Sequence, residues 1–395
     1  GNSEPVACST VPQLAEVIAA VDSWFDPAWA QSWDAVGLVC GDPAEPVDHV
    51  LLAVDPVAAT VDEAIGVAAR LLITHHPLLL TPVHGVPTSD PKSALVHRMI
   101  RNSVAHYVVH TNADVADPGV SDALAARIGL REVSPLESED DPAVDKLVVF
   151  VPTDDAQRLI DVLADAGAGR IGGYERCAWT VEGIGTFRPG VGTSPVIGER
   201  GRVESVGEMR VEMVLPGHRR GDVLRALHAA HPYETPAFDL VATSGQPTTR
   251  GTGRVGDLVT ATTLREFTAH VAAVLPRTTW GVRAAGEPDL PVRTVAVCGG
   301  SGGSLVDQAR RAGADAYVTA DLKHHPALEA VTEHGSGAMG LVDAAHWATE
   351  APWLDAVAER LTKRFGTGAA GLKVTVSTTV TDPWTLHTHT TETRL

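Results

Sequence analysis

The chain has 395 residues, more than one ordinary hydrophobic core accommodates, so two or three domains are expected. Hydrophobic residues make up 44% of the sequence and charged residues 20%, which is typical of a globular protein in water. The formal net charge of -18 argues against a nucleic-acid-binding surface, because binding phosphates requires clustered Lys and Arg.

The cysteines and the hydropathy pattern indicate in which cellular compartment we expect the protein. The four cysteines are widely separated: Cys8, Cys40, Cys177 and Cys298. Because no two form a CxxC pair, we expect buried thiols in a reducing compartment, without a zinc finger or a disulfide scaffold. No apolar run approaches the roughly 18 residues of a membrane span. We therefore expect a cytoplasmic protein that contacts neither a membrane nor nucleic acid.

The first segment alternates apolar runs with helical patterns. The apolar runs are 49–55, 70–74 and 105–110, and the helical patterns between them are 58–69 and 90–102. This order predicts βαβ units in a parallel sheet. Loops at the carboxyl ends of such strands are where α/β sheets carry their sites.

The middle segment has a different pattern. Residues 134–145 are acidic and contain proline, so we interpret them as a linker, and 244–257 as a second linker. Between them, two strand patterns each precede a helical pattern, which predicts a compact α+β unit. The predicted domains are an N-terminal α/β domain at 1–137, an insert at 145–244, and a C-terminal α/β domain at 250–395 that packs with the first.

An internal repeat relates the outer segments. Residues 61–76 align without a gap with 306–321, sharing Val-Asp-x-Ala, a helix, a strand and its final Thr. The preceding apolar runs, 50–56 and 295–301, fall in the same register. We therefore predict two related α/β halves interrupted by the insert.

Polar side chains follow three of the predicted strands. His75 and His76 follow the run 70–74, His110 and Asp114 follow the run that begins at Ala105, and His346 and Glu350 follow the run 338–342. The four-residue spacing of His346 and Glu350 places them on one face of a helix that begins there. The strand ends thus bring imidazoles and carboxylates to one edge.

Imidazole and carboxylate without thiolate suit Zn, Mn, Fe, Co or Ni. The five predicted metal ligands are His75, His76, Asp114, His346 and Glu350. With a bridging carboxylate they could hold two ions about 3.5 to 4 Å apart, an arrangement that activates water for hydrolysis. Taken alone, an HH pair is more often structural and HxxxE more often a solvated ion pair. Their shared position at strand ends favours a metal site.

Further residues are candidates for the same cleft. The repeat aligns Asp321 with His76, which makes Asp321 a catalytic candidate, as a proton relay or a partner of a ligand; the alternative is a helix N-cap. His110 could move protons or orient a ligand, or it could be a hydrogen-bonded strand-end histidine. The Gly-rich residues 299–304 could bind phosphate, although a tight turn is the preferred interpretation. Asp34 and Thr74 are additional cleft candidates.

Two stretches of the insert have alternative interpretations. Residues 231–239, HPYETPAFD, suggest a second metal site, but Pro232 and Pro236 interrupt any regular ligand spacing, so we predict a turn into a strand. The Gly-rich residues 183–201 are either a mobile loop or a rigid hairpin.

Several blocks of the sequence resemble a known family. They are SWDAVGLVCGDP, ITHHPLLL, HTNADVADPGVSDALA, GGSGGSLVDQARRAGADAYVTADLKHH and LVDAAHWATE. In this order they are similar to the successive signature blocks of the Nif-three-like family, the GTP cyclohydrolase 1 type 2 homologs. The insert is similar to the PII-like or CutA-like domain of longer bacterial members. The resemblance extends from about Val11 to Pro383.

The resemblance implies an α/β Nif-three-like fold of two related halves with an inserted α+β, PII-like (ferredoxin-like) domain. It implies two divalent ions per subunit, most simply Zn, with the same five ligands, and a homohexamer built as a trimer of dimers. Alanine replaces the usual family residue at Ala35, Ala113, Ala320 and Ala345. None of these departures removes a ligand, but those at Ala320 and Ala345 affect the loop shape and hence the fit of a substrate.

The activity implied by the resemblance is a metal-dependent hydrolase resembling GTP cyclohydrolase, in which metal-activated water attacks a nucleotide-like substrate. The sequence has no purine-binding motif of its own, so this substrate class rests on the resemblance alone. The alternative function is a non-enzymatic, metal-binding regulatory or scaffold ring.

Overall fold

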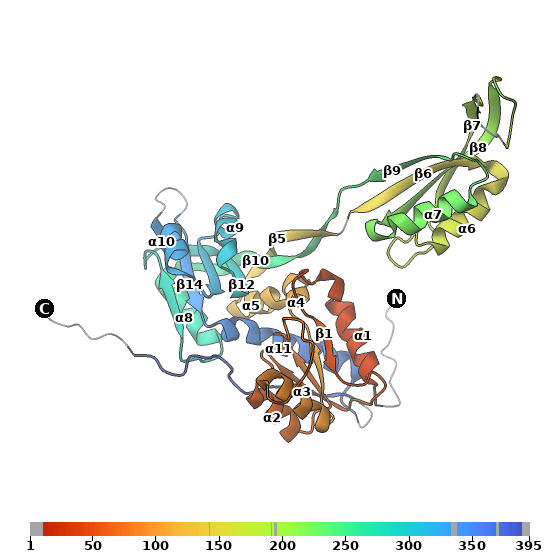
Figure 1. Cartoon of the computed structure of the whole chain (residues 1–395). Helices are drawn as coiled ribbons and strands as arrows, with labels where there is room; N and C mark the ends of the chain where they lie inside the picture. The colour runs from red at the N-terminus through yellow and green to blue at the C-terminus, as the bar shows by residue number, and fades with distance from the viewer. Residues whose placement is uncertain are drawn as a thin grey trace. The chain divides into compact units, whose positions relative to one another are not determined.

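The computed structural model describes residues 11–141, 143–190, 192, 196–332, 338–368 and 371–388. The chain forms two compact units, one containing residues 1–139 and 249–395 and the other residues 140–248 (Figure 1). Within the described ranges, no helix has the length and apolar character that crossing a membrane requires.

The first sheet of the larger unit has the strand order β1-β4-β3-β2-β15. Its strands are β1 (Gly37–Cys40), β2 (His49–Ala53), β3 (Leu71–Thr74), β4 (Ala105–Val108) and β15 (Lys373–Val376). The strands β15, β2, β3 and β4 run parallel, and β1 is antiparallel to β4. The predicted βαβ units are therefore confirmed.

Helices cover both faces of this sheet, which explains why β2, β3 and β4 are mostly apolar and are buried along their whole length. Leu51 and Leu72 pack with α2 (Ala58–Gly66) and α3 (Pro91–Arg101). On the opposite face, the sheet packs with α1 (Leu14–Trp24) and α11 (His346–Phe365).

The second sheet has the order β11-β14-β13-β12-β10-β5. Its strands are β5 (Arg131–Asp141), β10 (Gln246–Thr263), β11 (Val282–Ala285), β12 (Pro291–Ser301), β13 (Ala316–Ala320) and β14 (Gly340–Ala344). The parallel strands β12, β13 and β14 are bordered by the antiparallel edge strand β11, as β2, β3 and β4 of the first sheet are bordered by β1. The prediction of two related halves is confirmed.

Helices also cover both faces of the second sheet. The helices are α5 (Val120–Ile128) and α8 (Leu264–Val274) on one face, and α9 (Val306–Arg311) and α10 (His324–Thr332) on the other. Helix α11 packs against α5 and contacts β2 and β15 of the first sheet and β12 of the second. The two sheets therefore form one unit, and α11 begins where β14 ends.

The boundaries between the two units, after residues 139 and 248, lie within the predicted linkers at 134–145 and 244–257, but these segments are regular structure. They lie largely within the strands β5 and β10. Strand β5 is at the edge of the sheet and most of its side chains are exposed, so its acidic composition reflects solvent contact. Composition alone does not distinguish such an edge strand from a linker.

The smaller unit is an antiparallel sheet with two helices. In chain order its elements are β6 (Val144–Pro152), α6 (Ala156–Asp165), β7 (Trp179–Phe187), β8 (Glu204–Pro216), α7 (Arg220–Ala230) and β9 (Ala237–Ala242). The βαββαβ order and the sheet order β7-β8-β6-β9 are those of a ferredoxin-like fold. Short 3-10 turns across the chain are Pro27–Trp29, Thr153–Asp155, Gly217–Arg219 and Gly303–Leu305.

The two ambiguous stretches of the insert have simple structures. The turn predicted in 231–239 is confirmed, since it leads into β9, and both ring nitrogens of His231 bind backbone groups, of Phe150 and Tyr233. The start of the Gly-rich stretch, residues 183–187, pairs with β8 as a hairpin. Residues 191 and 193–195 of that stretch lie outside the described residues.

Candidate metal centre

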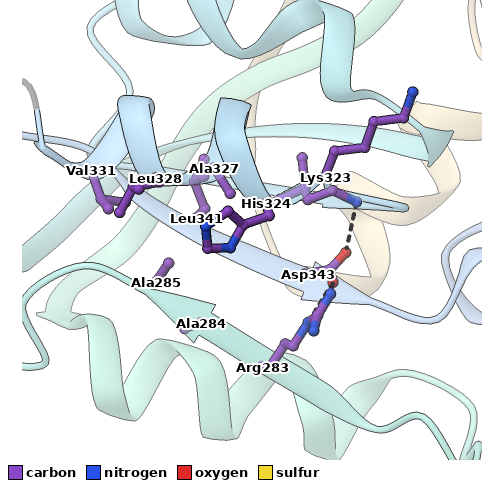
Figure 2. Close-up of a pocket in the computed structure, with 11 residues that line it drawn as sticks. Arg283, Ala284, Ala285, Lys323, His324, Ala327, Leu328, Val331, Leu341 and Asp343 are labelled. Atoms are coloured by element: carbon purple, nitrogen blue, oxygen red, sulfur yellow. Dashed lines mark hydrogen bonds and ion pairs between the residues drawn. The ribbon is translucent and has the colours of Figure 1, made fainter.

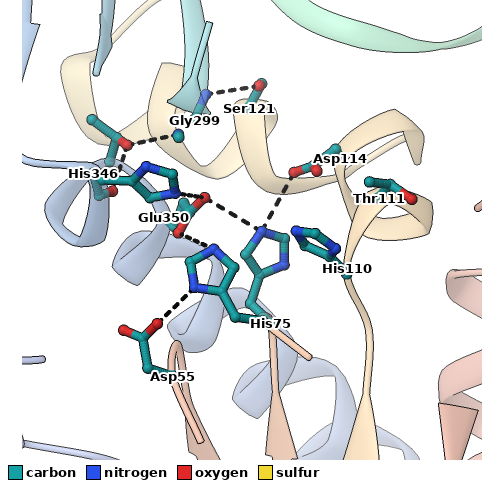
Figure 3. Close-up of polar contacts among 12 residues, drawn as sticks. Asp55, His75, His110, Thr111, Asp114, Ser121, Gly299, His346 and Glu350 are labelled. Atoms are coloured by element: carbon teal, nitrogen blue, oxygen red, sulfur yellow. Dashed lines mark hydrogen bonds and ion pairs between the residues drawn. The ribbon is translucent and has the colours of Figure 1, made fainter. Parts of the chain in front are cut away.

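Three strand ends bring imidazoles and carboxylates together at one edge of the larger unit (Figure 3). His75 and His76 directly follow β3. His110 follows β4, and Asp114 lies in the short helix α4 (Thr111–Val115). The end of β14 leads into α11, which carries the remaining two predicted ligands on one face as expected from their spacing.

Glu350 is at the centre of the cluster and is buried. Its Oε1 atom lies 3.5 Å from Nε2 of His75 and 3.0 Å from Nε2 of His346. Its Oε2 atom lies 3.2 Å from Nε2 of His76, while Nε2 of His75 lies 3.6 Å from Oδ1 of Asp114. The Glu350 carboxylate thus contacts both a first group of ligands, His75 with Asp114, and a second group, His76 with His346.

Each imidazole of the cluster is held from behind through Nδ1. The acceptors are Val109 O for His75 at 2.9 Å, Asp55 Oδ1 for His76 at 2.7 Å, Asp34 Oδ1 for His110 at 2.8 Å, and Asp321 Oδ2 for His346 at 2.6 Å. When Nδ1–H donates to these oxygens, the lone pair of Nε2 is directed away from them. This is the arrangement that orients histidines as metal ligands.

The residues present fit metal ions. Nε2 of His75 and Oε2 of Glu350 are buried and have no hydrogen-bond partner among the described residues, although buried polar atoms are normally paired. Ligand atoms of His75, His76 and His110 lie within 4.8 Å of one another, and so do those of His76, His346 and Glu350. The nitrogen and oxygen donors suit Zn and similar divalent ions.

The carboxylates change the proton affinities of the imidazoles. Burial alone lowers the pKa of His76, but Glu350 and Asp55 outweigh it and raise this pKa to about 11. Burial is likewise outweighed at His346, where Glu350 and Asp321 raise the pKa to about 9. Burial would raise the pKa of Glu350, but the charges of His76 and His75 hold it well below its ordinary value. Without an ion, His76 and His346 therefore carry protons at neutral pH.

Gly300 allows the second sheet to approach the cluster. Its φ of 66° is in the left-handed region, and a Cβ atom there would lie 2.4 Å from Oε1 of Glu350 and 3.1 Å from Nε2 of His346. The neighbouring amides are engaged by hydroxyl groups: Gly299 N with Ser121, Gly300 N with Thr349, and Gly302 N with Thr319. Residues 299–304 are thus a close-packed connection from the end of β12 to the 3-10 turn Gly303–Leu305, and these three amides are not free to bind phosphate.

The other predicted residues, Asp321, Asp34, Thr74 and His110, lie next to the five predicted ligands. Asp321 binds Nδ1 of His346, and because it lies before Lys323 and the start of α10 at His324, it is not the N-cap residue of that helix. Asp34 holds His110, and the Thr74 hydroxyl donates to the carbonyl of His76 at 2.8 Å. The ring of His110 lies close to His75 and His76, so its Nε2 is also placed as a ligand.

Two residues of the site were missed from the sequence. Asp55 holds His76, and Gly300 leaves space for Glu350. A signal for Asp55 existed, because it follows the apolar run of β2 as the histidines follow β3. For Gly300 there was only a Gly-rich turn, whose contact with α11 depends on how the two sheets pack.

A cavity of about 500 Å³ opens beside His76 and His346. Its other lining residues include Asp55, Asp321, Trp280, Trp347, Asp382 and Trp384. A second cavity, of about 420 Å³, is lined mainly by apolar side chains of α10 and its neighbours and has Arg283 in common with the first (Figure 2). The first cavity is the one that adjoins the candidate ligands.

Comparison with known proteins identifies the family. The sequence profile of the family described as Duf34/NIF3 (NGG1p interacting factor 3) matches residues 12–383. The chain belongs to the Duf34/NIF3 family. This confirms the resemblance on which the expected fold was based.

Relatives in the Duf34/NIF3 family are similar over almost the whole chain. A Mycobacterium tuberculosis protein named GTP cyclohydrolase 1 type 2 homolog is 49% identical over 375 residues, covering 95% of this chain and 97% of that protein. A Bacillus subtilis protein of the same name is 36% identical over 370 residues, with 94% and 97% covered. The chain thus spans nearly the whole length of both relatives.

Solved structures of Duf34/NIF3-related proteins have the same fold. A Bacillus cereus protein related to NIF3 is 35% identical, with a TM-score of 0.67, and 96% of this chain and 100% of that chain are covered. The Staphylococcus aureus protein SA1388 is 28% identical, with a TM-score of 0.76 and coverage of 95% and 99%. The predicted α/β fold is therefore confirmed.

We expect metal binding by this Duf34/NIF3 protein to release protons and to tighten as pH rises. Metal ions bind neutral imidazole, whereas the metal-free protein is protonated at His346 below about pH 9 and at His76 below about pH 11. For each proton that the metal displaces, the affinity for the metal increases by up to about tenfold when the pH rises by one unit. Calorimetry of Zn binding at pH 7.5 in buffers of different ionisation enthalpy should show at least two protons released per chain, because the pKa of His75 is also raised by Glu350 and Asp114. Proton release near zero would contradict the protonated metal-free site.

Proposed function

We propose that this protein is a metal-dependent hydrolase that acts on a nucleotide-like substrate. Two divalent ions, Zn in the first instance, would be held by His75, His76, Asp114, His346 and Glu350. The observation that carries the proposal is the convergence of oriented Nε2 atoms on the buried Glu350 carboxylate, beside a cavity of about 500 Å³.

When bound, such ions supply Lewis acidity and lower the pKa of water so that hydroxide is available near neutral pH. The residues of the chain have separate roles around them. Asp55 and Asp321 fix the rings of His76 and His346 through Nδ1, so that neither ring can turn away from the cavity. Glu350 contributes negative charge between the two groups of ligands.

His110 is placed to handle a proton at the edge of the cluster. Burial and the neighbouring His75 lower its pKa, so the ring is neutral at physiological pH and Nε2 can accept a proton. Asp34 holds the opposite nitrogen and stabilises the charged ring that results. His110 therefore has one of two roles. As the sequence predicts, it receives a proton during the reaction; alternatively, because it lies close to His75 and His76, it completes a set of metal ligands.

The cavity and the relatives suggest the substrate class. A volume of about 500 Å³ suits a small molecule of nucleotide size. Relatives named GTP cyclohydrolase 1 type 2 homolog support GTP as the first compound to test. The test also includes phosphoesters and amides, because dinuclear metal sites hydrolyse both.

The test is to prepare metal-free protein and to load it separately with Zn, Mn, Fe, Co and Ni. Each form is assayed with GTP, by formate release and by the ultraviolet spectrum of the opened ring, and with phosphoesters and amides. We expect turnover with at least one metal, and its loss by more than about 100-fold in His110→Gln if this residue moves a proton. Inactivity with every metal and substrate would contradict the hydrolase and favour the alternative of a metal-binding scaffold or regulator.

A further inference from the structure

Part of the wall of the 500 Å³ cavity is formed by the segment that follows β15. Hydroxyl groups anchor this segment to the first sheet and its helices. Ser377 and Thr379 donate to the carboxylate of Glu63, and Thr381 donates to Asp55, which also holds the ring of a candidate metal ligand. The residues that directly follow Thr381 are thereby held at the cavity.

Two indole rings lie side by side in this wall. The ring centroids of Trp280 and Trp384 are 5.6 Å apart, and the rings are tilted by 37°. The guanidinium of Arg283 lies 4.6 Å from the Trp280 ring centroid, so Trp280 is packed against both Arg283 and Trp384. Trp384 lines the cavity and yet remains 58% exposed. Its ring therefore offers an accessible, supported face on which a planar ligand can stack.

The cavity that Trp384 lines also reaches the candidate metal centre. His76 and His346 line another part of it, and their Nε2 atoms lie 3.2 and 3.0 Å from the Glu350 carboxylate. Ions held by these two histidines would border the same space. A single small molecule can therefore reach the ions and contact Trp384 at the same time, since about 500 Å³ is ordinary for a ligand pocket.

The other charged side chains of this cavity are engaged within the protein. Asp55 and Asp321 accept hydrogen bonds from Nδ1 of the two histidines. Arg283 forms an ion pair with Asp343, with nitrogen to oxygen distances of 2.7 and 2.6 Å, as Figure 2 shows. Asp382 is buried, and its Oδ2 atom is enclosed by protein. A ligand ring in the cavity is therefore recognised through its face, by stacking, rather than through charge pairing at its edge.

We propose that Trp384, supported by Trp280, binds a planar aromatic ring of a ligand whose polar part reaches the candidate ions. Stacking requires only a flat π surface, so the site accepts different aromatic rings and discriminates against ligands that have none. The ligand class is an aromatic ring joined to a group that metal ions can polarise, and nucleotides belong to it. The inference rests on the proposed function, because it names the substrate class for the cavity beside the candidate ions.

Binding of three related phosphates to the Zn-loaded protein tests the inference without requiring turnover. GMP and AMP share a ribose phosphate and carry different bases, whereas ribose 5-phosphate has no base. Calorimetry should show both nucleotides binding at least about tenfold more tightly than ribose 5-phosphate, and within about threefold of each other. Equal affinity for all three compounds, or a strong preference for one of the two bases, would overturn the proposal.

Substitutions of Trp384 distinguish stacking from a role in shaping the cavity. Trp384→Ala should weaken GMP and AMP by about tenfold or more and leave ribose 5-phosphate unchanged, whereas Trp384→Phe retains most of the nucleotide affinity. Trp179→Ala removes an equally exposed indole from the insert and should change nothing. If Trp384→Ala weakens ribose 5-phosphate as much as the nucleotides, Trp384 does not bind the base and the proposal is wrong.

The same variant separates this inference from the proposed hydrolase. If Trp384→Ala hydrolyses GTP with an unchanged KM, the stacking site is wrong while the hydrolase stands. If GMP and AMP bind through Trp384 as expected but no compound is turned over with any metal, the hydrolase is wrong while the stacking site stands.

Discussion

Replacing Glu350 with glutamine should remove most of the bound metal while leaving the fold intact. Glu350 exposes only 3% of its surface, and its two oxygens face Nε2 of three histidines, so both groups of ligands depend on its charge. A neutral amide of the same shape retains the packing but loses that charge. We expect the affinity for Zn to fall by at least about 100-fold, measured by competition with a chelator, and turnover to fall with it.

The control for this variant is Glu359→Gln. Glu359 is an exposed residue of the same helix, α11, so the substitution removes one negative charge without touching the cluster. It should keep the full metal content. A folded Glu350→Gln protein that binds as much metal as the unchanged chain would remove Glu350 from the site.

Replacing Gly300 with alanine should disturb the centre through shape alone. The added Cβ atom would lie 2.4 Å from Oε1 of Glu350, too close for either group to remain in place, and the positive φ adds strain of about 1 kcal/mol. Because Glu350 must shift away from His75 and His346, we expect Zn affinity to fall by about 10- to 100-fold. Chelator competition measures this loss, and thermal unfolding of the metal-free protein measures the strain.

Gly313→Ala is the matched control. Gly313 has a φ of 76°, but a Cβ atom there would meet nothing within 4 Å. The same backbone strain should therefore lower stability by a similar amount and leave metal binding unchanged. If both variants lose stability and neither loses affinity, Gly300 does not shape the site.

Much of the candidate site could be predicted because strand direction is easy to infer. Short apolar runs separated by helical patterns predict parallel strands, and parallel strands end at one edge of their sheet. This placed His75 and His76 with the residues that follow β4, although His76 and His110 are 34 positions apart in the sequence. The apolar run 338–342 in the other half likewise precedes His346 and Glu350, and it forms β14, the third parallel strand of that half.

What could not be predicted depends on how distant segments pack. Nothing local to Gly300 shows that α11 passes within contact distance, and nothing local to Trp384 shows that it meets Trp280. Strand β15 pairs with β2, and this pairing joins residues more than 300 positions apart. The residues that follow β15 thereby reach the cavity. The acidic residues of β5 were predicted to be a linker for a related reason: β5 pairs with β10, which is distant in the sequence.

The most direct measurement of the central claim is anomalous X-ray scattering from crystals of the protein loaded with Zn, recorded on both sides of the zinc absorption edge. The account predicts two anomalous peaks per chain about 3.5 to 4 Å apart, one beside His75 and Asp114 and the other beside His76 and His346, with Glu350 between them. Crystals with no peak at this cluster, or with Zn bound only elsewhere on the chain, would contradict it.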